Sequence, residues 1–373
     1  MLVQKIYVGL IILCTLSASF VFARHPFRTH HPQSTNVTVC CDGYKPSTLF
    51  SNRLRLYPIF AFRKQDVLDH LIPLEPITYR LDSSKTVPGA QLGKIVERVI
   101  FEVVTKKKLI KKAKETSDCT ILRDRNFNYK TSHGLIILKC KNYPFVVKIF
   151  MENPASFFDF HSTGIEPPFF FYMGGGANRH LTGMTRIRNR NLIQETIESL
   201  PRWKNHVEIP RKWYWLPKEQ KELTLIGRNI GGHEEIKTTI PALYAIIEDE
   251  IEIKKETNRI TPRKKRKLII ELCNDLHIYL DPHPHNYAFI EDKKTKQFKI
   301  ALVDTEHFPT MAGIETKVQF KDHFGWYTYL AQNYLSRLYG QTKKDLLMLQ
   351  GQVSEVSIHQ PIRVAAKIAK LHS

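Results

Sequence analysis

Several features that define common protein classes are missing from this sequence of 373 residues. It has no internal repeat, which argues against solenoid and propeller folds. None of its 6 cysteines forms a CxxC pair or a Cys/His cluster with zinc-ligand spacing, so a structural zinc site is not expected. After residue 23, no apolar run is long enough to cross a bilayer. With 42% hydrophobic and 25% charged residues, the chain has the composition of a globular protein.

Acidic residues are scarce. The chain has 36 Asp and Glu residues against 56 Lys and Arg residues, which gives a formal net charge of +20. Such a surface attracts polyanions, including nucleic acid, anionic lipid headgroups and phosphorylated ligands. The alternative is that the excess charge serves solubility and has no dedicated partner.

The first 23 residues have the pattern of an export signal. Lys5 provides the positive start, residues 6–23 are almost entirely apolar or small, and Val21-Phe22-Ala23 resembles a cleavage site. The alternative is an uncleaved membrane anchor, because a run of this length is just long enough to span a bilayer. We therefore expect an exported protein whose signal peptide covers residues 1–23.

The pattern of apolar residues predicts an α+β protein. Residues 24–50, rich in His, Pro, Ser and Thr, are expected to be irregular. Isoleucines and valines at helical spacing predict a helix over residues 88–115. Short apolar runs separated by turn residues then predict an antiparallel meander of three strands, over residues 120–122, 134–139 and 145–150.

The second half of the chain is expected to be mostly helical. Its predicted elements are helices over 191–200 and 267–280, a hairpin of strands 287–290 and 298–303, and helices from residue 324 onward. The helix over 267–280 is amphipathic, with leucines and an isoleucine forming its apolar stripe.

The residues that suggest chemistry follow this amphipathic helix. The segment Asp281-Pro282-His283-Pro284-His285-Asn286 leaves the helix, and Asp304 ends the second strand of the hairpin. The hairpin is expected to bring Asn286 and Asp304 together, although they are 18 positions apart (304 minus 286). Their amide and carboxylate oxygens are the hard ligands that Mg²⁺ prefers. Taken singly, Asp281 and Asp304 would equally suit turns.

The form Asp-x-His-Pro-x-Asn, followed by a strand that ends in Asp, resembles the catalytic loop and metal-binding strand of the protein-kinase-like superfamily. The likeness is to its atypical, aminoglycoside-phosphotransferase-like branch and covers roughly residues 120–340. It implies transfer of phosphate from ATP, with Mg²⁺, to a hydroxyl acceptor. Asp281 would orient the acceptor hydroxyl and accept its proton, and Asn286 and Asp304 would hold the metal.

The same resemblance implies the nucleotide-binding residues. Lys148, on the third predicted strand, corresponds to the lysine that holds nucleotide phosphates. Its expected partner is Glu195 on the following helix, with Glu198 as the alternative. Residues 244–251 resemble the hinge strand that meets the adenine.

The resemblance also implies a bilobal fold. A small antiparallel N-lobe with one helix and insertions would cover residues 120–253, and a mostly helical C-lobe would cover 254–373. Residues 24–119 would form an N-terminal extension. The chain departs from the family in lacking a Gly-x-Gly-x-x-Gly loop and in having Asp304-Thr305-Glu306 in place of Asp-Phe-Gly. A catalytically inactive kinase-like binding module is therefore the alternative function.

A dense basic run precedes the amphipathic helix and consists of Arg263, Lys264, Lys265, Arg266 and Lys267. It would serve as a solvated first helical turn, as a nuclear-localisation signal or as a site for an anionic partner. A further alternative is a basic exported protein that binds nucleic acid or an anionic surface. Because extracytoplasmic compartments of bacteria hold little ATP, an exported kinase would suit delivery into a host cell by an intracellular bacterium.

Overall fold

The computed structural model of the protein describes residues 35–40, 47–51, 64–151, 183–184, 186–229, 235–251, 262–276, 280–291, 298–305, 319–322 and 325–326. The predicted signal peptide and nearly all of the helical region predicted from residue 324 onward lie outside these ranges. The described part is an α+β structure with mostly antiparallel sheets and few helices. Its helices are all too short or too polar to span a membrane.

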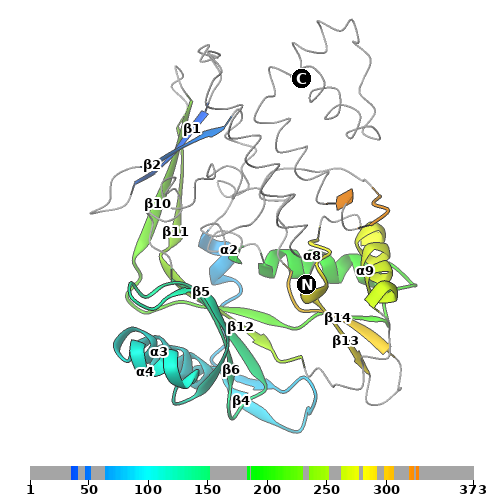
Figure 1. Cartoon of the computed structure of the whole chain (residues 1–373), viewed down its shortest axis with the longest axis horizontal. Coiled ribbons are helices and arrows are strands. Elements are labelled where there is room, and N and C mark those ends of the chain that lie inside the picture. The colour runs from blue at the N-terminus through cyan, green and yellow to red at the C-terminus, as the bar shows by residue number, and fades with distance from the viewer. Residues whose placement is uncertain are drawn as a thin grey trace, which may run out of the picture.

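A five-stranded antiparallel sheet combines three consecutive strands with two that come later in the chain (Figure 1). In spatial order its strands are β5 (Cys119–Asn128), β6 (His133–Cys140), β7 (Phe145–Met151), β12 (Leu243–Asp249) and β9 (Lys212–Trp215). The first three are the predicted meander, which is confirmed. Their β-branched and aromatic side chains favour strands and supply the buried face of the sheet.

Helix α3 (Gly89–Thr105) packs against this sheet and is followed by the short helix α4 (Lys107–Ala113). The inner face of α3 buries Val96, Val99 and Val103 completely or nearly so. The single helix predicted over residues 88–115 is therefore two helices. The break falls at Lys106, whose backbone leaves the helical region (φ −105°, ψ 33°).

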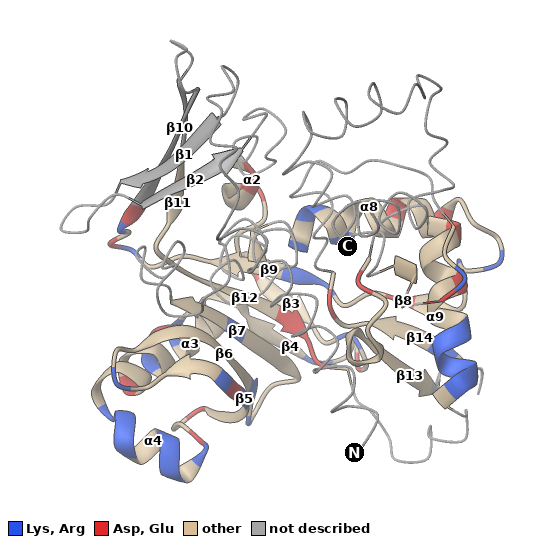
Figure 2. Cartoon of the chain, turned by 45° about the horizontal axis from the view of Figure 1, so that its top comes forward, with Lys and Arg blue, Asp and Glu red and all other residues tan. Residues whose placement is uncertain are grey.

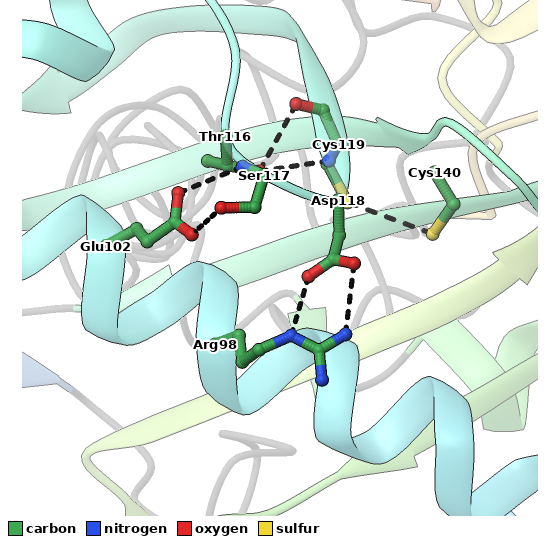
Figure 3. A network of polar contacts seen from close by, with 7 residues as sticks. All are labelled: Arg98, Glu102, Thr116, Ser117, Asp118, Cys119 and Cys140. Atoms are coloured by element: carbon green, nitrogen blue, oxygen red, sulfur yellow. Dashed lines mark hydrogen bonds and ion pairs between the residues drawn. The ribbon is translucent and has the colours of Figure 1, made fainter.

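Polar contacts fix α3 to the start of β5 (Figure 3). Arg98 donates two hydrogen bonds to the carboxylate of Asp118, at 2.8 and 3.0 Å. One turn later, Glu102 accepts a hydrogen bond from the backbone N–H of Ser117 at 3.0 Å and another from its hydroxyl. Glu102 is 8% exposed, so its contacts satisfy a buried carboxylate.

A second antiparallel sheet joins segments that are far apart in the chain. Its spatial order is β11 (Glu235–Pro241), β10 (Glu222–Asn229), β1 (Thr35–Cys40) and β2 (Ser47–Ser51). The expectation that residues 24–50 are irregular was therefore wrong for β1 and β2. Strand β1 pairs with β10, a distant partner that a local pattern does not show, and β2 joins the sheet by pairing with β1.

Smaller elements link the two sheets and the helical part. Helix α2 (Lys64–Leu68) precedes a hairpin of β3 (Pro76–Thr78) and β4 (Thr86–Pro88). The backbone N–H of Ile72 donates to the oxygen of Tyr214 on β9 at 2.8 Å, which ties this region to the five-stranded sheet.

A second core is built on two helices and a hairpin. Its elements are α8 (Arg186–Glu198), β8 (Val207–Glu208), α9 (Pro262–Leu276), the 3-10 turn η6 (Pro284–Asn286), β13 (Tyr287–Glu291) and β14 (Phe298–Leu302). The apolar stripe of α9 packs with Ile193 and Ile197 of α8 and with the hairpin in one core. Strands β13 and β14 pair antiparallel, as predicted, and β8 pairs parallel to β14. Because α9 begins at Pro262, the basic run forms its first turns.

Candidate functional site

The loop after α9 holds Asp281 and Asn286 in a defined arrangement. The Asp281 carboxylate accepts a hydrogen bond from the backbone N–H of His283 at 3.0 Å. The side-chain amide of Asn286 donates through Nδ2 to the backbone oxygen of Asp281 at 3.3 Å. Both side chains are half-buried. The two residues predicted to act on substrate and metal therefore share one short, internally bonded loop.

The hairpin brings Asp304 to this loop. Tyr287 and Leu302 are opposite one another in the β13–β14 pair, so the residues just outside them meet at the open end. The backbone oxygen of Asn286 accepts hydrogen bonds from the N–H groups of Val303 at 2.9 Å and Asp304 at 3.3 Å. The predicted proximity of Asn286 and Asp304 is confirmed at the level of the backbone.

Lys148 belongs to a buried cluster of charges on the five-stranded sheet. Its Nζ lies 2.9 Å from Oε1 of Glu248 on β12. The Nζ of Lys212 on β9 lies 2.7 Å from Oε2 of the same glutamate. All three residues are at most 5% exposed. A buried charge is tolerated when it is paired and hydrogen-bonded, so one carboxylate that serves two ammonium groups explains how this cluster is stable.

The expected pairing of Lys148 with Glu195 is not what the structure shows. Glu195 lies on α8 between Ile193 and Ile197, which are buried in the core shared with α9. A residue two positions from each of these isoleucines projects from the opposite side of the helix. Glu195 is accordingly exposed, as is the alternative Glu198, which accepts a hydrogen bond from Gln194 at 3.0 Å. Glu248 takes the place of the helix glutamate.

The charge cluster alters the titration of Lys212 and Glu248. Complete burial lowers the pKa of Lys212 to about 8, and the nearby Lys148 ammonium acts in the same direction against the opposing effect of Glu248. For Glu248, burial alone would raise the pKa. The two adjacent lysines outweigh burial and hold the pKa of Glu248 below its usual range. The carboxylate therefore stays ionised at neutral pH.

The cluster is connected to the strand end that carries Asp304. Lys212 Nζ donates a hydrogen bond to the backbone oxygen of Val303 at 3.0 Å. The same stretch is held from the other side by α8, since the hydroxyl of Thr305 donates to the backbone oxygen of Arg186 at 2.7 Å. Lys148 is thus linked to the Asp304 region through Glu248, Lys212 and Val303.

Arg186 is a further cation at this position. Its Nη1 lies 3.0 Å from Oδ1 of Asp304, and the residue is 3% exposed. The guanidinium lies over the ring of Phe150, 5.6 Å from its centroid, which is a cation–π geometry. Arg186 therefore supplies Asp304 with a counter-charge in the present arrangement.

The residues present are compatible with a magnesium site. Asn286 donates through Nδ2, so its Oδ1 remains as an acceptor, and Asp304 contributes a carboxylate next to it. Oxygen ligands of this type, completed by water and nucleotide phosphate, suit Mg²⁺. Within the described ranges, no group of three or more His, Cys, Asp or Glu side chains converges in the manner of a metal site built entirely from protein.

Sequence reasoning missed Glu248, Lys212 and Arg186. A signal for the first two was present, because Glu248 follows Ala245-Ile246-Ile247 and Lys212 precedes Trp213-Tyr214-Trp215. A charge at the end of an apolar strand requires a partner, and two such strands with opposite charges are candidates for pairing. Arg186 had no comparable signal, because residues 185–190 around it are mostly polar.

Comparison with known proteins does not assign this chain to a family. No protein-family model, curated protein or solved structure matches the chain. A functional proposal for this protein therefore depends on its motif and on the geometry described above.

Proposed function

We propose that the protein is an exported kinase-like phosphotransferase that uses ATP and Mg²⁺ to phosphorylate a hydroxyl acceptor. One observation carries the proposal: Asp281, Asn286 and Asp304 meet at the end of the hairpin, and the Lys148–Glu248–Lys212 cluster contacts the same strand end. These residues come from three strands of one sheet, a loop and a hairpin. Turn propensity explains any one of these residues alone more easily than it explains all of them together.

The order of elements supports a kinase-like architecture of two lobes. Strands β5, β6 and β7 form a meander with Lys148 on the third strand, as in the family's phosphate-binding strand. Helix α8 follows, and β9 and β12 then complete the same sheet. An amphipathic helix, the 281–286 loop and the hairpin come next (Figure 1). This is the sequence of elements that the resemblance implies.

Each residue has a task in this proposal. Asp281 orients the acceptor hydroxyl and accepts its proton. Lys148 neutralises nucleotide phosphate, and Glu248 holds its ammonium in position. Asn286 and Asp304 would hold Mg²⁺, which when bound neutralises charge on the phosphates. Lys212 adds a second positive charge beside the first and anchors the Val303 carbonyl, so the strand end and the lysine pair form one unit.

The test is thermal unfolding of the full chain with ATP, with and without Mg²⁺. A ligand present at roughly 100 times its dissociation constant stabilises the folded state by about 2.7 kcal/mol. We expect a magnesium-dependent rise in the midpoint that Asp304→Asn abolishes and that Glu195→Gln, a change at an exposed carboxylate, leaves intact. The absence of any rise in the wild-type protein at millimolar ATP would refute the proposal.

The Arg186–Asp304 ion pair favours a second candidate, the inactive kinase-like binding module. A buried arginine on the metal-binding carboxylate competes with a cation for that carboxylate. In this case the wild-type protein would show no magnesium-dependent shift. A shift that appears in Arg186→Gln alone would show that the ion pair is what blocks the site.

A further inference from the structure

The outer surface of α3 and α4 combines positive charge with exposed apolar side chains, and the proposed active site uses none of it. This α3–α4 surface consists of Phe101, Val104, Lys106, Lys107, Lys108, Leu109, Lys111 and Lys112. In Figure 2, α4 is a largely blue segment at the edge of the molecule, at the opposite end from the blue first turns of α9. The molecule therefore presents two separate basic regions.

The positive charge of the α3–α4 surface is not neutralised by neighbouring acids. Three carboxylates in the segment that follows α4 already have partners: Asp118 pairs with Arg98, Asp124 with Lys114, and Glu115 with Lys141. Over the part of the chain that the structure describes, no ion pair involves the four exposed lysines of this surface, Lys106, Lys108, Lys111 and Lys112. An anion brought to this surface would meet several uncompensated charges at once.

Helix stability accounts for only some of these lysines. Lys106 is the C-cap of α3, and Lys111 and Lys112 lie in the last turn of α4, where positive charge suits the helix dipole. Lys107 and Lys108 lie in the first turn of α4, where positive charge opposes the dipole of that helix, and this turn contains no acidic residue.

Packing in the core does not account for the exposed apolar side chains of this surface either. Phe101 is 65% exposed, Leu109 is 62% exposed and Val104 is 38% exposed. The core contacts of α3 are made by its inner face, where Val96, Val99 and Val103 are buried, and α4 buries Ile110. The three exposed side chains thus lie outside the packed interior, among the lysines.

We propose that the α3–α4 surface docks on membranes that carry anionic phospholipids. Lysines interleaved with large apolar side chains suit the interfacial layer, where ammonium groups meet lipid phosphates and apolar groups enter the acyl boundary. The lysine stems can lie along the apolar layer with their charges at the headgroups. A nucleic acid would attract the same lysines, but it offers no apolar layer for Val104 and Leu109. This inference is independent of the phosphotransferase proposal.

The test is co-sedimentation of the full chain with vesicles of phosphatidylcholine and phosphatidylserine, and with vesicles of phosphatidylcholine alone. The key variant combines Lys106→Gln, Lys108→Gln, Lys111→Gln and Lys112→Gln, the four exposed lysines of this surface. The matched control combines Arg263→Gln, Lys264→Gln, Arg266→Gln and Lys267→Gln in α9, which removes the same charge from the other basic region. The apolar segment at residues 6–23 is common to all these proteins, and the neutral vesicles measure its contribution.

Each lysine near an anionic surface changes the partition coefficient about fivefold. We expect the α3–α4 variant to lose at least about 100-fold in binding to the anionic vesicles, and the α9 control to lose far less. Phe101→Ala with Leu109→Ala should also weaken binding, while leaving its dependence on salt unchanged. All of the changed lysines are surface positions, and an unaltered unfolding midpoint would verify that the variants fold.

Equal losses in the two basic variants would attribute binding to net charge and would overturn the proposal. So would tight binding to double-stranded DNA or RNA without binding to anionic vesicles, which would assign the surface to nucleic acid. Unchanged vesicle binding in the α3–α4 variant would also refute it.

Discussion

Replacing Glu248 by glutamine removes the one carboxylate that two buried lysines share. Glu248 Oε1 and Oε2 lie 2.9 and 2.7 Å from the ammonium groups of Lys148 and Lys212, and the glutamate is 2% exposed. Glutamine keeps the volume but not the charge, so both ammonium groups lose their counter-ion. Breaking a buried ion pair in this way lowers the free energy of unfolding by about 3–5 kcal/mol.

The structure also limits how large the loss can be. A lysine left without its partner can release its proton. Deprotonation at pH 7 of a group whose ordinary pKa is 10.5 requires about 5 kcal/mol, at 1.36 kcal/mol per pKa unit. We therefore expect Glu248→Gln to lower the unfolding free energy by about 3–5 kcal/mol at pH 7, a large part of the stability of a typical domain.

The assay is urea denaturation followed by circular dichroism, with Glu195→Gln as the matched control. Glu195 is exposed, so its replacement should change the unfolding free energy by no more than about 0.5 kcal/mol. The defect of Glu248→Gln should shrink as the pH rises from 7 to 10, because the unpaired lysines become neutral in the folded state. A loss below about 1 kcal/mol, or a loss equal to that of Glu195→Gln, would refute the buried-cluster reasoning.

Two further predictions concern titration and helix attachment. Burial lowers the pKa of Lys212 to about 8 from 10.5, so between these two pH values the unfolded chain binds more protons than the folded protein. The unfolding free energy of the wild-type protein, relative to that of Lys212→Met, should therefore rise with pH across this window. Parallel urea titrations should show a rise of up to about 3 kcal/mol. In the contacts between α3 and β5, Glu102→Ala should lower the thermal midpoint more than Arg98→Ala. The Glu102 change leaves the Ser117 N–H without its buried acceptor, at about 1–3 kcal/mol, whereas the half-exposed Arg98–Asp118 pair contributes about 0.2–1 kcal/mol. A larger drop of the calorimetric midpoint in Arg98→Ala than in Glu102→Ala would contradict the burial assigned to Glu102.

Elements defined by short-range patterns could be predicted from the sequence. The meander of β5, β6 and β7, helix α9 and the β13–β14 hairpin all combine one clear periodicity with nearby turn residues. The proximity of Asn286 and Asp304 followed from the hairpin alone. In each of these cases the interacting partner lies within a few tens of residues.

Features set by distant partners could not be predicted. The local pattern of β1 and β2 indicates an irregular chain, because β1 pairs with the distant strand β10 and β2 joins the sheet only through β1. Glu195 was chosen for Lys148 because it lies on the right helix, but the core shared by α8 and α9 determines which face of that helix is buried. Glu248 and Lys212 were visible as charged residues in apolar strands, and their pairing required the strand order of the sheet. A local pattern therefore identified the elements, and tertiary packing selected the partners.

The pairing of β1 with β10 has a consequence for how the chain folds. Thr35 is opposite Asn229, so the two partners are separated by 194 positions (229 minus 35). A contact of such sequence separation carries a large loop-closure entropy and forms slowly. During synthesis, β1 and β2 can pair only with each other until β10 has emerged, while β5, β6 and β7 form a complete meander from immediate neighbours. The four-stranded sheet is thus expected to form late, and its unpaired strand edges are exposed to aggregation in the meantime.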